Sequence, residues 1–112
     1  MLLPDADRAF IDLRKLVEYS LSPDHPVGGH KAILFQSIFG ITGEDALVLR
    51  DTLLHVATRA AAAIGRLDEF GQRYTIDFTL STATATASIR SGWIVRSTED
   101  FPRLTTCFVL RD

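Results

Sequence analysis

The spacing of apolar residues changes partway along the chain and divides it into two halves. Before Ala60 the apolar side chains recur at intervals close to 3.6, which is the period of an α-helix. After Gly71 apolar and polar residues alternate, which is typical of strands with one face toward water. We therefore expect helices in the first half and strands in the second.

Three helical segments are predicted in the first half. Asp12 can cap the first of them. Its apolar positions are Leu13, Leu16, Val17 and Leu21. A second helix is expected over 30–39, with Gly40 as its C-terminal cap. A third begins at 42–45, where acidic residues oppose the positive end of the helix dipole.

The region between the two halves is open to two interpretations. Residues 60–63 either extend the third helix or begin a strand, and Gly65 is expected to end that segment. Alternation is then clear over 74–80, continues over 83–96 and returns at 104–110. Sequential strands with short links favour an antiparallel meander. The predicted fold class is α+β, with N-terminal helices packed on one face of a C-terminal antiparallel meander sheet of about four strands.

The predicted core draws on both halves of the chain. We expect one cluster of mostly buried side chains, made by Leu16, Phe35, Leu53, Ile76, Phe78 and Trp93. Each lies on the apolar stripe of a predicted helix or on the apolar side of a predicted strand. His55 sits among leucines in the third helix with no partner at metal-ligand spacing, so it is interpreted as structural.

The composition limits the classes of function that the sequence supports. At this length, residues 1–112 are expected to form one domain. The net charge of −2 gives no overall attraction to nucleic acid, so polyanion binding would need a local cationic patch. Cys107 is the single cysteine, which excludes an intrachain disulfide and a cysteine-rich zinc site. No membrane-spanning run or secretion signal is recognised, and we expect a soluble cytoplasmic domain.

Several motifs along the chain resemble those of one protein family. The longest is Lys15-Leu16-x-x-Tyr19-x-Leu21-x-Pro23-x-His25-Pro26-x-Gly28-x-x-Lys31-Ala32-x-x-Phe35. The later ones are Gly71-x-x-Tyr74, Arg90-x-x-Trp93-Ile94 and Pro102-Arg103-Leu104-Thr105-Thr106. On these motifs the chain is similar, from Ala9 to Leu110, to a small bacterial family of uncharacterised domains.

The resemblance implies a place in bacterial toxin loci, either in a toxin–antitoxin pair or at the tip of a polymorphic toxin. It also implies a layout similar to that of the barnase–EndoU–colicin–RelE group of ribonucleases, by analogy at the level of the fold. One departure concerns the turn after Leu80, where the family has glycine and this chain has Ser81-Thr82-Ala83-Thr84. A longer hairpin tip is expected there.

Metal-independent RNA cleavage defines the chemistry that candidate residues must supply. It needs a base for the 2′-hydroxyl, an acid for the leaving 5′-oxygen, and cations beside the phosphate. His25, His30 and Lys31 cluster in a glycine-containing loop at a helix start, where free backbone N–H groups favour anions. With Arg90 they are the candidate catalytic residues. The alternative is that His25 shapes the loop and Lys31 is a solvated helix charge.

The polar side of the predicted strands supplies candidate substrate-binding residues. Arg73 lies on one strand, and Arg103 and Thr106 stand at the start of the last one. An arginine on an open sheet face can hold a phosphate through two parallel hydrogen bonds. The more common alternative is a cross-strand ion pair, such as one between Arg90 and Asp77.

Two functions from different classes fit these patterns. The first is a metal-independent ribonuclease toxin that acts on RNA without a cofactor and is neutralised by an antitoxin or immunity protein. The second is a non-catalytic interaction module that binds a protein through the polar sheet face. The acidic balance and the scarcity of lysine, with only Lys15 and Lys31, favour the second, since RNA-binding domains are usually basic.

Overall fold

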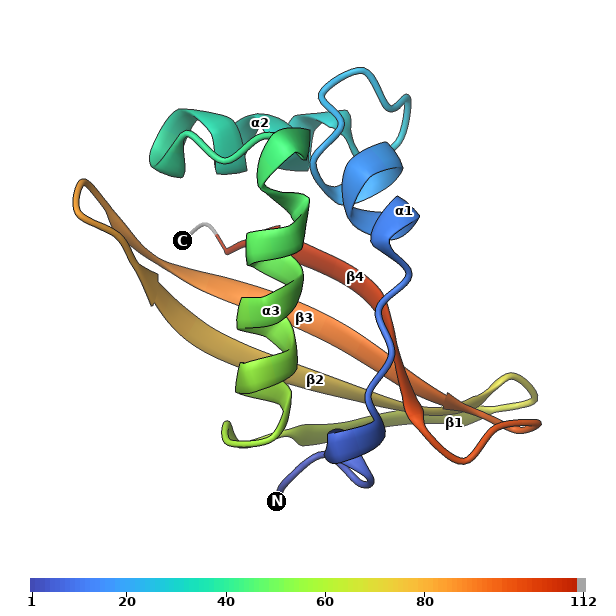
Figure 1. Ribbon diagram of the computed structural model, residues 1–112. Coiled ribbons are helices and arrows are strands. Elements are labelled where there is room, and N and C mark those ends of the chain that lie inside the picture. Colours follow the sequence, from blue (N-terminus) through green and yellow to red (C-terminus); the bar gives the residue numbers. More distant parts are fainter. Residues whose placement is uncertain (111–112) are drawn as a thin grey trace.

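The computed structural model describes residues 1–110 and shows helices on one face of an antiparallel sheet (Figure 1). The helical elements are η1 (Ala6–Arg8), α1 (Leu13–Lys15), η2 (Leu16–Ser20), α2 (Gly29–Phe39), η3 (Gly43–Asp45) and α3 (Ala46–Ala57). The strands are β1 (Ala63–Asp68), β2 (Gly71–Ser81), β3 (Thr86–Arg96) and β4 (Pro102–Val109). The predicted α+β class is confirmed.

The four strands follow one another in the order β1-β2-β3-β4, and every neighbouring pair is antiparallel. The register pairs Tyr74 with Trp93 and Phe78 with Ile89, so apolar side chains of β2 and β3 share the face that meets the helices. The opposite face carries polar residues and is exposed at Asp77. The sheet is therefore the meander that the alternation predicts.

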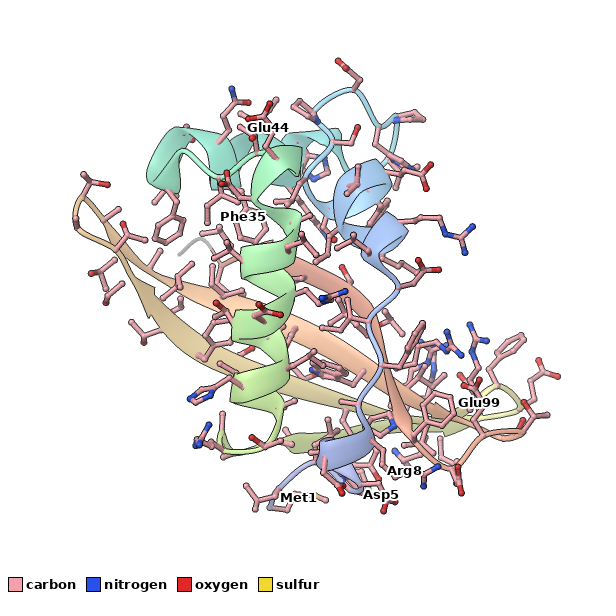
Figure 2. The ribbon with its side chains drawn as sticks, viewed as in Figure 1. Met1, Asp5, Arg8, Phe35, Glu44 and Glu99 are labelled. Atoms are coloured by element: carbon pink, nitrogen blue, oxygen red, sulfur yellow. The ribbon has the colours of Figure 1, made fainter. Side chains whose placement is uncertain are left out.

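The hydrophobic core lies between the helices and the inner face of the sheet. Five of the expected core residues are at most 1% exposed, namely Leu16, Phe35, Leu53, Ile76 and Trp93. Figure 2 shows Phe35 turned inward from α2. Phe78 packs against this cluster but is only half-buried, because the β2–β3 hairpin extends past the layer of helices (Figure 1).

Side chains fix two helix starts where the sequence predicts them. Asp12 Oδ1 accepts a hydrogen bond of 3.1 Å from the backbone N–H of Arg14. At η3, Thr42 and Asp45 form a reciprocal capping box, in which the Thr42 N–H donates to Asp45 Oδ2 at 2.9 Å. α2 ends at Gly40 with φ of 70°, a left-handed conformation that glycine adopts without steric cost.

The first helix differs from the expected regular α-helix. From Leu16 onward it widens into a π-type turn, in which the Leu21 N–H donates to the Leu16 carbonyl at 2.8 Å. The wider turn brings Ser20 and Leu21 inside with Leu16 and leaves Val17 43% exposed. The placement of Val17 on the apolar stripe is therefore wrong, because that prediction assumed α-helical spacing throughout.

The edge strand β1 resolves the ambiguous region between the two halves. α3 ends at Ala57 and β1 begins at Ala63. Gly65 lies inside this strand and does not end it. The pairing with β2 slips between Ile64 and Leu67, which is a β-bulge, and five of the six residues of β1 are exposed.

The opposite edge strand, β4, is partly covered by the N-terminal segment. The Phe10 N–H donates to the Pro102 carbonyl at 2.9 Å, and the Leu104 N–H donates to the Phe10 carbonyl at 3.0 Å. Arg8 then reaches Asp100 at 2.8 Å, at the end of the molecule where Figure 2 labels Arg8 and Glu99. These contacts join the chain's first turn to the β3–β4 connection.

Within residues 1–110, no single helix is long and apolar enough to cross a membrane. α2 and the segment 43–57 pass that test of length and composition only as a pair, and the pair is bent by 78°.

Candidate functional site

The loop between η2 and α2 is braced by His25. Its Nδ1 atom accepts hydrogen bonds from the backbone N–H groups of Val27 and Gly28, each at 3.0 Å. An imidazole nitrogen that accepts hydrogen bonds carries no proton, so in the neutral ring the proton is on Nε2. These hydrogen bonds agree with the alternative interpretation, in which His25 shapes the loop, and they leave an N–H donor at the other ring nitrogen.

Two glycines allow this loop to pack closely. The Tyr19 ring meets the His25 ring edge-on, with 4.6 Å between centroids and 86° between planes. A Cβ atom on Gly28 would lie 3.0 Å from the Tyr19 ring. A Cβ on Gly29 would lie 2.3 Å from the carbonyl oxygen of Pro23. The loop is thus held in one conformation by contacts that larger residues would break.

His25 lines a shallow pocket together with side chains of α1 and η2. The pocket measures about 290 Å³ and is lined by Asp12, Arg14, Lys15, Glu18, Tyr19 and His25. Lys15, Glu18 and Tyr19 all line this pocket, so they share one side of the helical segment. This pocket, called the His25 pocket below, gathers an imidazole, a phenol, an ammonium group and carboxylates.

One ion pair already exists within the His25 pocket. Arg14 donates to Asp12 through Nε at 3.1 Å and Nη2 at 2.8 Å. These side-chain hydrogen bonds, with a further one from the Arg14 backbone, hold the pKa of Asp12 below its ordinary range. Asp12 is therefore ionised and held by Arg14, whereas the Glu18 carboxylate makes no hydrogen bond within residues 1–110.

Sequence reasoning did not assign Lys15, Glu18 and Tyr19 to the site. Lys15 and Tyr19 do belong to the long motif that also contains His25. Their spacing on one helix side was the available signal. What the sequence did not reveal is that this side of the helix meets the His25 loop.

His30 and Lys31 stand in the first turn of α2 and do not line the His25 pocket. His30 is exposed. Lys31 places its Nζ 4.1 Å from the centroid of the Phe108 ring, on edge strand β4. This cation–π contact means that Lys31 is not a purely solvated charge.

Arg90 lies on the open face of the sheet and is paired with Asp77. Its Nε and Nη2 atoms donate to the two carboxylate oxygens of Asp77, both at 2.9 Å. The hydrogen bond from Arg90 lowers the pKa of Asp77, against a smaller opposing effect of burial. The structure thus contains the cross-strand pair that was the alternative interpretation of Arg90.

Phe108 is a neighbour of both Lys31 and Arg90. It is the register partner of Arg90 on β4, so both side chains project from the outer face of the sheet. Arg90 and Asp77 line a hollow of about 390 Å³ with Ala61, Ala63 and Thr75, which is separate from the His25 pocket. Of the predicted catalytic residues, His25 and Arg90 thus line separate hollows, and His30 and Lys31 line neither of the two.

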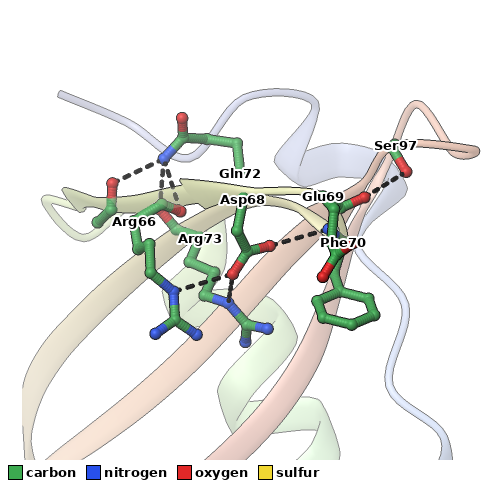
Figure 3. Close-up of polar contacts among 8 residues, drawn as sticks. Arg66, Asp68, Glu69, Phe70, Gln72, Arg73 and Ser97 are labelled. Carbon is green, nitrogen blue, oxygen red and sulfur yellow. Dashed lines mark hydrogen bonds and ion pairs between the residues drawn. The ribbon is translucent and has the colours of Figure 1, made fainter.

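The three predicted substrate-binding residues have different surroundings. Arg103 donates to Glu99 at 3.2 and 2.6 Å, and its guanidinium lies 4.7 Å from the centroid of the Phe10 ring. Arg103 is therefore held within the fold by an ion pair and a cation–π contact. Thr106 is half-buried beside Gly92 on the outer face. Arg73 lies 3.5 Å from Asp68 at the β1–β2 end of the sheet (Figure 3).

Within residues 1–110, no group of three or more His, Cys, Asp or Glu side chains is arranged to hold a metal ion. The side chains that line the His25 pocket include proton donors, proton acceptors and cations.

The chain matches one family model, over residues 2–111. The family is described as a domain of unknown function, DUF6883, and the chain belongs to it. Among curated proteins and among solved structures, none matches the chain.

Proposed function

We propose that this protein is a metal-independent ribonuclease whose active site is the His25 pocket. The observation that carries this proposal is the fixed His25 ring beside Lys15, Glu18 and Tyr19 in one pocket. RNA cleavage without a metal needs a proton acceptor, proton donors and a cation near one phosphate. This pocket supplies each of them from two adjoining segments of the chain.

The reaction forms a bond between the 2′-oxygen and phosphorus and breaks the bond from phosphorus to the 5′-oxygen. Glu18 takes the proton of the 2′-hydroxyl, because its carboxylate is the pocket's acceptor outside the Asp12–Arg14 pair. The Tyr19 hydroxyl gives a proton to the leaving 5′-oxygen. His25 acts through its Nε2–H as a donor to a phosphoryl oxygen.

Lys15 supplies the positive charge that this reaction requires. Charge develops on the phosphoryl oxygens in the transition state, and an ammonium group stabilises it there. Lys15 lines the pocket on the helix side that carries Glu18 and Tyr19. The products are a 2′,3′-cyclic phosphate and a 5′-hydroxyl, which distinguishes this chemistry from metal-dependent hydrolysis.

The test uses a variant that keeps the loop and removes the donor. In His25→Asn the side-chain amide oxygen can still accept from the backbone N–H groups of Val27 and Gly28, but the imidazole Nε2–H is gone. We expect RNA cleavage in the presence of a chelator to fall on the order of 100-fold or more. His55→Asn, on α3 outside the pocket, is the matched control.

Two outcomes would reject the ribonuclease. One is purified wild-type protein that leaves diverse RNAs intact, with and without ribosomes. The other is a His25→Asn variant as active as the wild type. We extend the proposal to a toxin held in check by an antitoxin or immunity protein, so expression without that partner should arrest growth and His25→Asn should relieve the arrest.

A second candidate function is an interaction module that binds a protein through the outer sheet face. The specific observation in its favour is the engaged Arg90–Asp77 pair on a chain of net charge −2. In that case Arg90→Ala should weaken a stable protein complex, and the complex should have no effect on RNA. His25→Asn should leave that complex unchanged.

A further inference from the structure

A hollow of about 340 Å³ opens on the outer face of the sheet, where the β1–β2 turn meets the ends of β3 and β4. Its lining residues are Glu69, Phe70, Arg73, Ile94, Arg96, Ser97, Thr98 and Thr105. Ile94 is 5% exposed although it lies on the polar face, so it is the apolar floor of the hollow. We call this hollow the Phe70 pocket. It is separate from the His25 pocket.

Two guanidinium groups in the Phe70 pocket form long ion pairs without a hydrogen bond to a carboxylate. The Nε of Arg73 is buried and has no hydrogen-bond partner within residues 1–110, and its nearest acid oxygen, on Asp68, is 3.5 Å away. The Arg96 guanidinium approaches Glu99 only to 3.9 Å and makes no hydrogen bond within residues 1–110. Arg90 and Arg103, by contrast, each engage a carboxylate through two hydrogen bonds.

Phe70 is an exposed aromatic ring on a fixed turn. It is 62% exposed. Its N–H donates to Asp68 Oδ1 at 2.9 Å, and its carbonyl accepts from the Ser97 N–H at 3.0 Å. The Ser97 hydroxyl also donates to the Glu69 carbonyl at 3.2 Å (Figure 3). The ring is therefore presented to solvent by a rigid support.

Gly71 makes this close support possible. Its φ is 142°, and a Cβ atom there would lie 2.1 Å from the Val95 carbonyl oxygen. Only glycine lets β2 approach β3 so closely at this point. The turn that carries Phe70 is thus pressed against the end of β3, which brings the ring to the two arginines.

We propose that the Phe70 pocket binds one nucleotide unit of single-stranded RNA. Arg73 and Arg96 hold the phosphate, and the Thr105 hydroxyl adds a neutral donor. The base stacks on Phe70, which is how single strands are commonly held on exposed aromatic rings. The carboxylate of Glu69 also lines the pocket and opposes the phosphate charge. Removing that charge should therefore tighten binding.

This inference rests on the proposed function only in taking RNA as the ligand. The Phe70 pocket would be a binding subsite for the strand, and the His25 pocket the place of cleavage. Binding is measured separately from cleavage, in a His25→Asn background that leaves the strand intact.

The experiment measures fluorescence anisotropy of a short labelled single-stranded RNA at several salt concentrations. Phe70→Ala should weaken binding about tenfold or more, since stacking on one ring has that magnitude. Arg73→Gln and Arg96→Gln should each lower the salt slope by about 0.7, the value for one phosphate of a single strand. Glu69→Gln should bind more tightly than its parent.

Two matched controls change residues that do not line the Phe70 pocket. Leu67→Ala removes an apolar side chain that is 72% exposed, three residues before Phe70, and should leave binding unchanged. Arg59→Gln removes one positive charge away from the lining and should leave the salt slope unchanged. Folding of Arg73→Gln is checked by denaturation, and the gain in Glu69→Gln tests the same pocket without removing a contact.

The outcomes separate this inference from the ribonuclease itself. Binding that depends on Phe70, Arg73 and Arg96 supports the subsite, even where the wild type cleaves no RNA. Cleavage with unchanged binding in Phe70→Ala, Arg73→Gln and Arg96→Gln overturns the subsite and leaves the ribonuclease standing. A protein that binds no single-stranded RNA overturns it as well.

Discussion

Arg90 faces Asp77 across β3 and β2, and two hydrogen bonds of 2.9 Å join the guanidinium to the carboxylate. The side chains are 44% and 42% exposed, so water screens the attraction between them. A phosphate that approaches Arg90 has to compete with Asp77 for the same donor atoms. This pair is the main reason why we propose an active site in the His25 pocket and not around Arg90.

Arg90→Ala is expected to change the free energy of unfolding only slightly near neutral pH. The hydrogen bond from Arg90 holds the pKa of Asp77 below its ordinary value of 3.8. A lowered carboxyl pKa stabilises the fold above the unfolded-state value, and that contribution is lost as pH falls through the folded-state value. The small difference between wild type and variant in urea denaturation should therefore disappear in strong acid. A difference that grows in acid would contradict this.

Gly29→Ala should destabilise the protein by roughly 1–3 kcal/mol, because the new Cβ collides with a backbone oxygen that cannot turn away. That oxygen belongs to Pro23 and would be 2.3 Å distant. Gly43→Ala is the control, since no atom lies within 4 Å of its added Cβ. Chemical denaturation of both variants measures the effect. Equal free energies of unfolding for the two variants would show that the loop can shift to make room for the new Cβ atom.

Ser91→Ala should cost roughly 1–3 kcal/mol through an unsatisfied buried donor. The Ser91 hydroxyl accepts from Trp93 Nε1 at 3.0 Å and donates to the Ile76 carbonyl at 2.9 Å. Both Ser91 and Trp93 are at most 1% exposed. Denaturation followed by tryptophan fluorescence measures the loss. Ser88→Ala, at an exposed position of the same strand, should be almost neutral.

Cys107 should resist thiol reagents in the native protein. Burial raises the pKa of its thiol to about 12 from an ordinary value of 9.0. A raised pKa means that the contribution to stability is present below about pH 9 and is lost as pH rises toward about 12. Labelling should therefore proceed only at the rate of opening. Rapid stoichiometric labelling under native conditions would place the thiol at the surface.

Phe35→Ala should lower the free energy of unfolding by roughly 3–5 kcal/mol, through lost burial and the cavity left behind. Phe35 is 0% exposed. Phe78→Ala should cost less, because Phe78 is half-buried near the free end of the hairpin. Urea denaturation of the two variants gives the order directly. A larger loss for Phe78 would mean that the hairpin contributes more to folding than its burial indicates.

Local signals carried most of the fold prediction. The capping residues Asp12 and Thr42 begin helices where expected, because a side chain that accepts from the backbone acts within one turn. The alternation around Ile76 placed the inner face correctly. Val17 and Gly65 were misplaced, because a π-type turn and a β-bulge each change the residue count without an obvious local signal.

The candidate site was only partly visible in the sequence. His25 stood out through its prolines and glycines, but Glu18 belongs to a helix that reaches the loop only in the folded chain. Ile94 was equally hidden, since nothing in the alternation indicates that an apolar residue on the polar face is covered. The sequence predicts that Arg73 binds substrate, but only the folded chain shows that its Nε makes no hydrogen bond within residues 1–110.

The exposed strand β1 bears on how the molecule behaves at high concentration. An open sheet edge with free backbone groups is a template on which a second copy can extend the sheet, the first step toward aggregation. Ile64 and Leu67 are 64% and 72% exposed on this edge, which adds an apolar attraction. The bulge between them and the Arg66–Asp68 ion pair interrupt the flat ladder that such stacking needs. The irregular backbone of β1 thus makes it harder for a second copy of the chain to pair with this edge of the sheet.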